Sequence, residues 1–78
     1  MARAYFDDAE TIARMLEKEG EVSTAAEFRS AIASGSTGTE ILMRLNYQCR
    51  EALDAGIGGE LTRARIHDLA EAIQEVLA

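Results

Sequence analysis

The apolar positions of this chain fall into four stretches of helical periodicity, and one of the two longest covers residues 38–55. Its apolar side chains recur every three or four positions and define one helix face: Ile41, Leu42, Leu45, Cys49, Ala52 and Leu53. Thr37, with Glu40 three residues later, forms the capping-box pattern that begins a helix, and Gly56 can adopt the left-handed conformation after its end. We therefore expect a central helix on which the other helices pack.

Three further helices are predicted from the same pattern, over residues 8–19, 24–34 and 60–77. Their predicted inward faces consist of Ala9, Ile12, Ala13 and Leu16 in the first helix, Ala25, Phe28 and Ile32 in the second, and Leu61, Ile66, Leu69, Ala70, Ile73, Val76 and Leu77 in the last. Asp7 and Ser23 precede the first two helices and are residue types that cap helix N-termini. The absence of proline also favours helices. The chain is expected to be all-α, a compact bundle of four amphipathic helices in one domain over residues 1–78.

Length and charge narrow the class of protein. A chain of 78 residues buries only about 60% of its unfolded surface, so its core is modest and an oligomer would add stability. The 14 acidic and 8 basic side chains give a net charge of −6, which opposes binding to nucleic-acid phosphates and suits a basic protein partner. No stretch reaches the roughly 18 apolar residues of a membrane span, and the first residues show no apolar signal region. We expect a cytoplasmic protein that binds neither nucleic acid nor membrane.

Side chains that could support catalysis are few. Cys49 is the only cysteine, and its place on the apolar face of the central helix favours a buried, unreactive thiol. His67 is the only histidine; Glu71 lies one turn after it, but a metal site needs three or four ligands. The size and acidity also suit an acyl carrier protein, yet the Asp-Ser-Leu motif that carries the prosthetic group of that family is absent. We expect no enzymatic activity, no metal and no cofactor.

A second, narrower stripe on the central helix consists of Met43, Tyr47 and Arg50, at spacings of four and three residues. Such a stripe can pack against a neighbouring helix while the tyrosine hydroxyl reaches water. Alternatively, the stripe is exposed and contacts a partner, because tyrosine and arginine are enriched in binding hot spots.

Acidic side chains also line up on two of the predicted helices: Asp68, Glu71 and Glu75 on the last, and Glu10, Glu17 and Glu21, with Arg14 among them, on the first. A solvated surface accounts for such stripes. Like charges on one helix face are mildly destabilising, however, so a basic partner is the other explanation.

The stretch GSTGTEILMRLNYQCREAL, residues 35–53, resembles small bacterial proteins encoded beside polymorphic or contact-dependent toxins. Such proteins are thought to act as immunity proteins. In size, acidity and helix number the chain is also similar to the colicin nuclease immunity proteins. It lacks their acidic helix and paired-tyrosine sequence, so no contact residues carry over from them.

The resemblance implies an immunity protein that neutralises a basic toxin domain, such as a nuclease, by stoichiometric occlusion of its active or substrate-binding site. The expected contacts are Tyr47 as an anchor, with Met43 and Arg50 beside it, and the acidic stripe of the last helix facing the toxin. The alternative is a homo-oligomeric helical module, such as a homodimer, or a small structural subunit of a larger assembly. Self-association of the isolated chain distinguishes the two.

Overall fold

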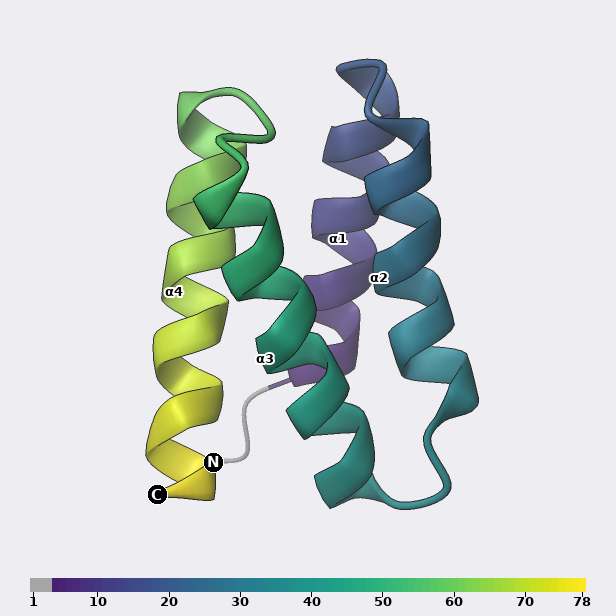
Figure 1. Cartoon of the computed structure of the whole chain (residues 1–78), viewed down its shortest axis with the longest axis vertical. Helices are drawn as coiled ribbons and strands as arrows, with labels where there is room; N and C mark the ends of the chain where they lie inside the picture. The colour runs from purple at the N-terminus through teal and green to yellow at the C-terminus, as the bar shows by residue number, and fades with distance from the viewer. Residues whose placement is uncertain (1–3) are drawn as a thin grey trace.

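The four predicted helices are present in the computed structural model, which describes residues 4–78 (Figure 1). The helices are α1 (Tyr5–Lys18), α2 (Val22–Ser34), α3 (Gly38–Asp54) and α4 (Glu60–Leu77). Consecutive helices run in opposite directions, and the described chain contains no strand. The all-α bundle predicted from the sequence is therefore confirmed.

The helices occupy the corners of a square bundle measuring 30 × 22 × 22 Å. Helices α1 and α3 each pack against α2 and α4, so α1 and α3 stand at opposite corners. In Figure 1, α3 lies in front, between α4 on the left and α2 on the right, with α1 behind. This arrangement leaves α3 with a long outward face, because only the opposite side of the helix is turned toward the core.

The turn between α1 and α2 explains why the predicted start of α2 is wrong. Gly20, at φ 83°, follows α1, and the N–H groups of Gly20 and Glu21 donate to the carbonyls of Glu17 and Leu16 at 3.1 and 2.8 Å. This is a Schellman motif. Glu21 then serves directly as the N-cap residue of α2, so that Ser23, the predicted cap, lies inside the helix.

Helix α1 also begins earlier than predicted, at Tyr5 instead of residue 8. Asp7, the predicted cap, lies in the first turn together with Asp8, and the N-cap residue is Ala4, which makes no side-chain cap. The carboxylates still favour this helix end, because they lie near the positive end of its dipole.

The start and end of α3 follow the prediction closely. Thr37 Oγ1 accepts a hydrogen bond from the N–H of Glu40 at 3.1 Å. After the helix, Gly56 adopts φ 68°, and the N–H groups of Gly56 and Ile57 donate to the carbonyls of Leu53 and Ala52 at 3.1 and 3.0 Å. A second Schellman motif therefore ends α3 at Asp54, one residue before the predicted end.

The core is formed by the inward faces of all four helices. Its largest fully buried apolar side chains are Phe28, Ile12, Leu16, Leu45, Ile66, Leu69 and Ile73, with Cys49 among them. One part of the predicted core is wrong: Leu61 is 77% exposed and Val76 is 53% exposed. Thr62, the residue after Leu61, is buried instead because its hydroxyl has a partner within the fold.

Candidate protein-binding surface

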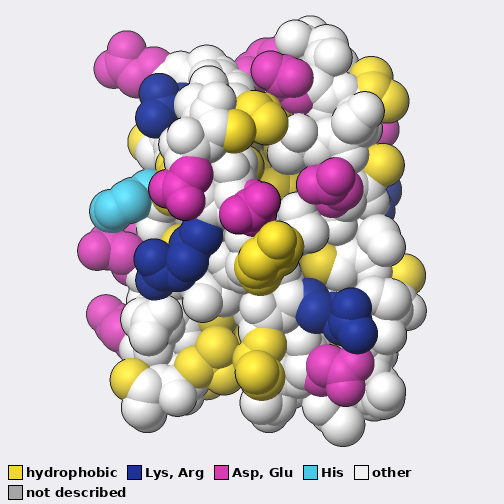
Figure 2. Space-filling view, in the orientation of Figure 1, with side chains coloured by type: hydrophobic (Ala, Val, Ile, Leu, Met, Phe, Trp, Pro, Cys, Tyr) yellow, Lys and Arg dark blue, Asp and Glu magenta, His cyan; other side chains and the backbone are white. Residues whose placement is uncertain are grey.

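The outward face of α3 carries two large apolar side chains in contact with solvent. Met43 is 58% exposed and Tyr47, one turn later, is 59% exposed. For these two residues, the alternative in which the stripe packs against a neighbouring helix is therefore wrong. Figure 2 shows hydrophobic side chains at the middle of this face, flanked by basic and acidic side chains on both sides.

A shallow surface hollow of about 490 Å³ lies beside these residues, between α2 and α3. Met43 and Tyr47 lie on its α3 side, and on the α2 side the short side chains of Ser30, Ala31 and Ser34 leave the space open. Glu27 also lines the hollow. A side chain from a partner protein can therefore enter next to an exposed tyrosine, which is the usual setting of an interface hot spot.

Arg50, the third member of the predicted stripe, reaches in the opposite direction. Its Nη2 donates to Gln74 Oε1 of α4 at 3.0 Å. Arg44, which the stripe did not include, lines the hollow and donates to Glu40 Oε1 at 3.3 Å. The exposed Met43–Tyr47 pair is thus bordered by arginine on both sides of α3.

The acidic side chains predicted to face a partner lie on a different surface from Tyr47. Gln74 points toward α3, since it accepts the hydrogen bond from Arg50. At 100° per residue, Asp68, Glu71 and Glu75 lie roughly 60–120° further round α4, away from the buried positions. All three are exposed. They form the outer acidic face of α4, and the structure does not bring this face and Tyr47 onto one flat surface.

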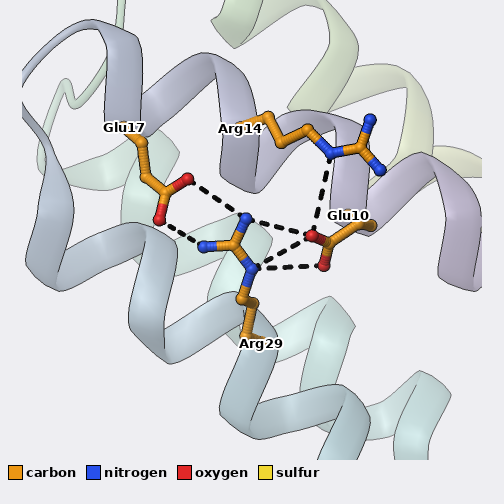
Figure 3. A network of polar contacts seen from close by, with 4 residues as sticks. All are labelled: Glu10, Arg14, Glu17 and Arg29. Carbon is orange, nitrogen blue, oxygen red and sulfur yellow. Dashed lines mark hydrogen bonds and ion pairs between the residues drawn. The ribbon is translucent and has the colours of Figure 1, made fainter.

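The acidic stripe of α1 has a structural partner that the sequence did not reveal. The Arg29 guanidinium, from α2, lies between Glu10 and Glu17 (Figure 3). Its Nη2 is 3.0 Å from Glu10 Oε1 and 3.1 Å from Glu17 Oε1, its Nε is 3.1 Å from Glu10 Oε1, and its Nη1 also binds Glu17. The hydrogen bond from Arg29 lowers the pKa of Glu17, and the two carboxylates raise the pKa of Arg29. This cluster joins α1 to α2. It gives two of the three side chains of the predicted acidic stripe, Glu10 and Glu17, a structural role within the fold.

A second structural carboxylate lies at the end of α1. Glu19 accepts a hydrogen bond from the N–H of Gly59 at 2.6 Å and another from the hydroxyl of buried Thr62. These two hydrogen bonds, that of Thr62 foremost, lower the pKa of Glu19. Gly59 is the N-cap residue of α4 and has no side chain to cap the helix, so Glu19 supplies a cap from another helix. A sequence pattern cannot show this cap, because the two residues are 40 positions apart.

Cys49 and His67 do not belong to the exposed face of α3, since Cys49 is on the buried side of that helix and His67 is in α4. Cys49 is fully buried, and burial raises the pKa of its thiol to about 12. His67 is exposed, with Nδ1 at 3.6 Å from Glu71 Oε1. Within residues 4–78, no three His, Cys, Asp or Glu side chains are grouped so that they could hold a metal ion. None of the helices in this part of the chain has the length and apolar character needed to cross a bilayer.

Comparison of the chain with protein-family models, with curated proteins and with solved structures finds no match. The resemblance of residues 35–53 to immunity proteins stays a hypothesis. The surface itself must therefore supply the argument about function.

Proposed function

We propose that this chain is a protein-binding domain that acts as an immunity protein and neutralises a basic bacterial toxin by occluding its active or substrate-binding site. The observation that carries the proposal is the exposure of Met43 and Tyr47 at the edge of the α2–α3 hollow, in a chain of net charge −6. A tyrosine and a methionine in solvent add little to the stability of a small domain, and both are enriched in binding sites.

The exposed face of α3 and the outer acidic face of α4 have different roles in the proposed binding. Tyr47 and Met43 act as the anchor, since they can be desolvated by a partner that fills the hollow. The outer acidic face of α4 acts at longer range, because a negative field attracts a basic domain before contact is made. In this mechanism Asp68, Glu71 and Glu75 raise the association rate, and the anchor residues slow dissociation.

The test is toxicity of the C-terminal domain encoded by the neighbouring upstream gene, with and without this chain. Rescue of growth, together with a one-to-one complex in size-exclusion chromatography, is the expected result. A harmless neighbour, or toxicity that the chain does not relieve, contradicts the immunity role.

Variants then test the mechanism on the purified complex. Tyr47→Ala should weaken binding by about 2 kcal/mol, mainly by faster dissociation, whereas Leu61→Ala, at another exposed apolar position, should leave it unchanged. Neutralising Asp68, Glu71 and Glu75 together should slow association and reduce its salt dependence. Equal effects of Tyr47→Ala and Leu61→Ala would show that α3 is not the contact surface.

A homo-oligomeric helical module is the alternative function. The same exposed residues favour it, since a methionine and a tyrosine on one helix face can also contact a second copy of the chain.

A further inference from the structure

The exposed face of α3 has the spacing of a coiled-coil seam. Glu40, Met43, Tyr47, Arg50 and Asp54 follow one another at intervals of three, four, three and four residues. This is the a/d pattern of a heptad repeat, with apolar residues in the middle and charged residues toward the ends. The buried face of α3 is a separate set centred on Leu45, Cys49 and Ala52, so the seam is surplus to the core of the bundle.

The order of residues along this seam is complementary to itself when one copy is reversed. A two-fold axis perpendicular to α3 turns the helix end to end, so a residue before the centre meets the residue equally far after it. Met43 and Tyr47 are centred on position 45, and so are Glu40 and Arg50. One axis therefore places the Met43 thioether against the Tyr47 ring of a second copy, and the Glu40 carboxylate against the Arg50 guanidinium of that copy, each contact occurring twice. Sulfur–aromatic contacts and opposite charges are both favourable.

The surface that presents these side chains is accessible. Helix α3 stands at a corner of the bundle, and Met43 and Tyr47 are both more than half exposed. The Glu40 side chain is 41% exposed and binds Arg44, one turn later in its own helix, while Arg50 donates to Gln74 at the surface. Such exposed polar contacts contribute little to the stability of the fold. The Glu40 carboxylate and the Arg50 guanidinium can therefore exchange these partners for others at small cost in free energy. In the paired arrangement Glu40 lies between Arg44 of its own chain and Arg50 of the second copy.

We propose that the chain forms an antiparallel homodimer through the outer face of α3, with Met43–Tyr47 contacts at the centre and Glu40–Arg50 ion pairs at both ends. This inference develops the homo-oligomeric alternative and does not rest on the immunity function, since it concerns the purified chain alone. The paired part of the seam, from Glu40 to Arg50, is short, about 15 Å at 1.5 Å per residue, so the interface belongs to the small, weak class.

Sedimentation equilibrium of the purified chain tests the proposal, from about 1 µM to about 500 µM, a range that brackets weak association. We expect a monomer–dimer equilibrium. Glu40→Arg and Arg50→Glu, made separately, should each weaken dimerisation at least tenfold, because each places like charges at both ends of the seam. Glu75→Arg and Arg65→Glu make the same charge changes on α4, outside the seam, and should have no such effect.

Mixing the two seam variants gives the decisive result. Equimolar Glu40→Arg and Arg50→Glu should form a heterodimer, because arginines at both positions of one chain then face glutamates of the other. The double variant Glu40→Arg/Arg50→Glu should recover the homodimer. Circular dichroism of each variant confirms that the helices are intact.

Three outcomes would overturn the inference. The first is a chain that stays monomeric to about 500 µM, which leaves the seam to a partner of different sequence. The second is a dimer that the seam charges do not affect, which must use another surface. The third is a pair of single variants that weaken the dimer but do not associate with each other, which excludes the antiparallel pairing.

Discussion

The junction between α2 and α3 offers a sharp test of the packing, because Gly35, in the link, and Gly38, the first residue of α3, should respond oppositely to the same substitution. Gly35 has φ −79° and ψ 143°, a conformation that alanine adopts without strain. A Cβ at Gly35, however, would lie well inside the van der Waals contact distance of Ile41 Cγ1 and only 3.0 Å from the backbone N of Ile41. A Cβ at Gly38 would have no atom within 4 Å among residues 4–78, apart from its two chain neighbours and the adjoining backbone of α3.

The expected magnitudes follow from these surroundings. At Gly35, overpacking costs about 1–3 kcal/mol, offset by about 0.4–1 kcal/mol from the lower entropy of the unfolded chain. Ile41 cannot easily move away, because a β-branched side chain is stiff at χ1 and the backbone atom is fixed by α3. Gly35→Ala should therefore destabilise the domain by about 1–2 kcal/mol, which lowers Tm by about 4–16 °C at this chain length. Gly38→Ala, at the first residue of α3, should raise Tm by a few degrees, because alanine is favoured over glycine in a helix.

Thermal unfolding followed by circular dichroism measures both variants, and a double-mutant cycle identifies the cause. Ile41→Ala removes Cγ1, so Gly35→Ala should cost much less in the Ile41→Ala background than in the natural chain. A Gly35→Ala variant as stable as Gly38→Ala, or a cycle in which the two effects simply add, would refute the argument that Ile41 sets the requirement for glycine.

Three further predictions test the rest of the fold. Glu19→Gln should lower the free energy of unfolding near neutral pH, because the depressed pKa of Glu19 adds stability above the ordinary value of 4.5 that is lost on protonation. The difference in unfolding free energy between the natural chain and the variant should therefore close as the pH falls below 4.5. Urea titrations across this range check it, with Glu75→Gln as the control, and a difference that does not depend on pH would contradict it. Native Cys49 should react with a thiol reagent only as fast as the domain unfolds, and immediate reaction in the absence of denaturant would contradict its burial. Phe28→Ala should lower the free energy of unfolding by about 3–5 kcal/mol, out of the roughly 4–12 kcal/mol of stability expected for a chain of this length. Val22→Ala, at an exposed position, should change the free energy of unfolding by no more than about 0.5 kcal/mol in the same urea titration.

Local signals explain which parts of the fold could be predicted from the sequence. The helix α3 was predicted almost to the residue because its cap, its apolar face and its terminal glycine all lie within or beside it. The starts of α1 and α2 were misplaced because Asp7 and Ser23 look like caps in isolation, while the Schellman turn at Gly20 makes Glu21 the cap of α2.

Long-range contacts account for what the sequence did not show. Thr62 is buried in place of Leu61 because its hydroxyl donates to Glu19, which lies just after the end of α1. The role of Arg29 likewise depends on α2 lying beside the acidic stripe of α1. Periodicity identified both apolar stripes on α3, but only the packing of the four helices decides that Met43 and Tyr47 face solvent.

The two proposals for α3 use the same residues, and this makes them mutually exclusive on any one molecule. A partner that binds Tyr47 must displace the second copy of the chain from a dimer. The apparent affinity of the chain for that partner therefore falls as the chain concentration rises above the dimer dissociation constant. If the dimer is weak and the partner binds tightly, most of the chain is in the complex with the partner, by mass action. Arg50→Glu separates the two events, because it breaks the proposed ion pairs and leaves Tyr47 in place. At high concentrations of chain, this variant should bind a one-to-one partner at least as well as the natural chain does. If the variant instead loses partner binding while remaining folded, Arg50 itself contacts the partner, and the surface extends across α3 toward α4.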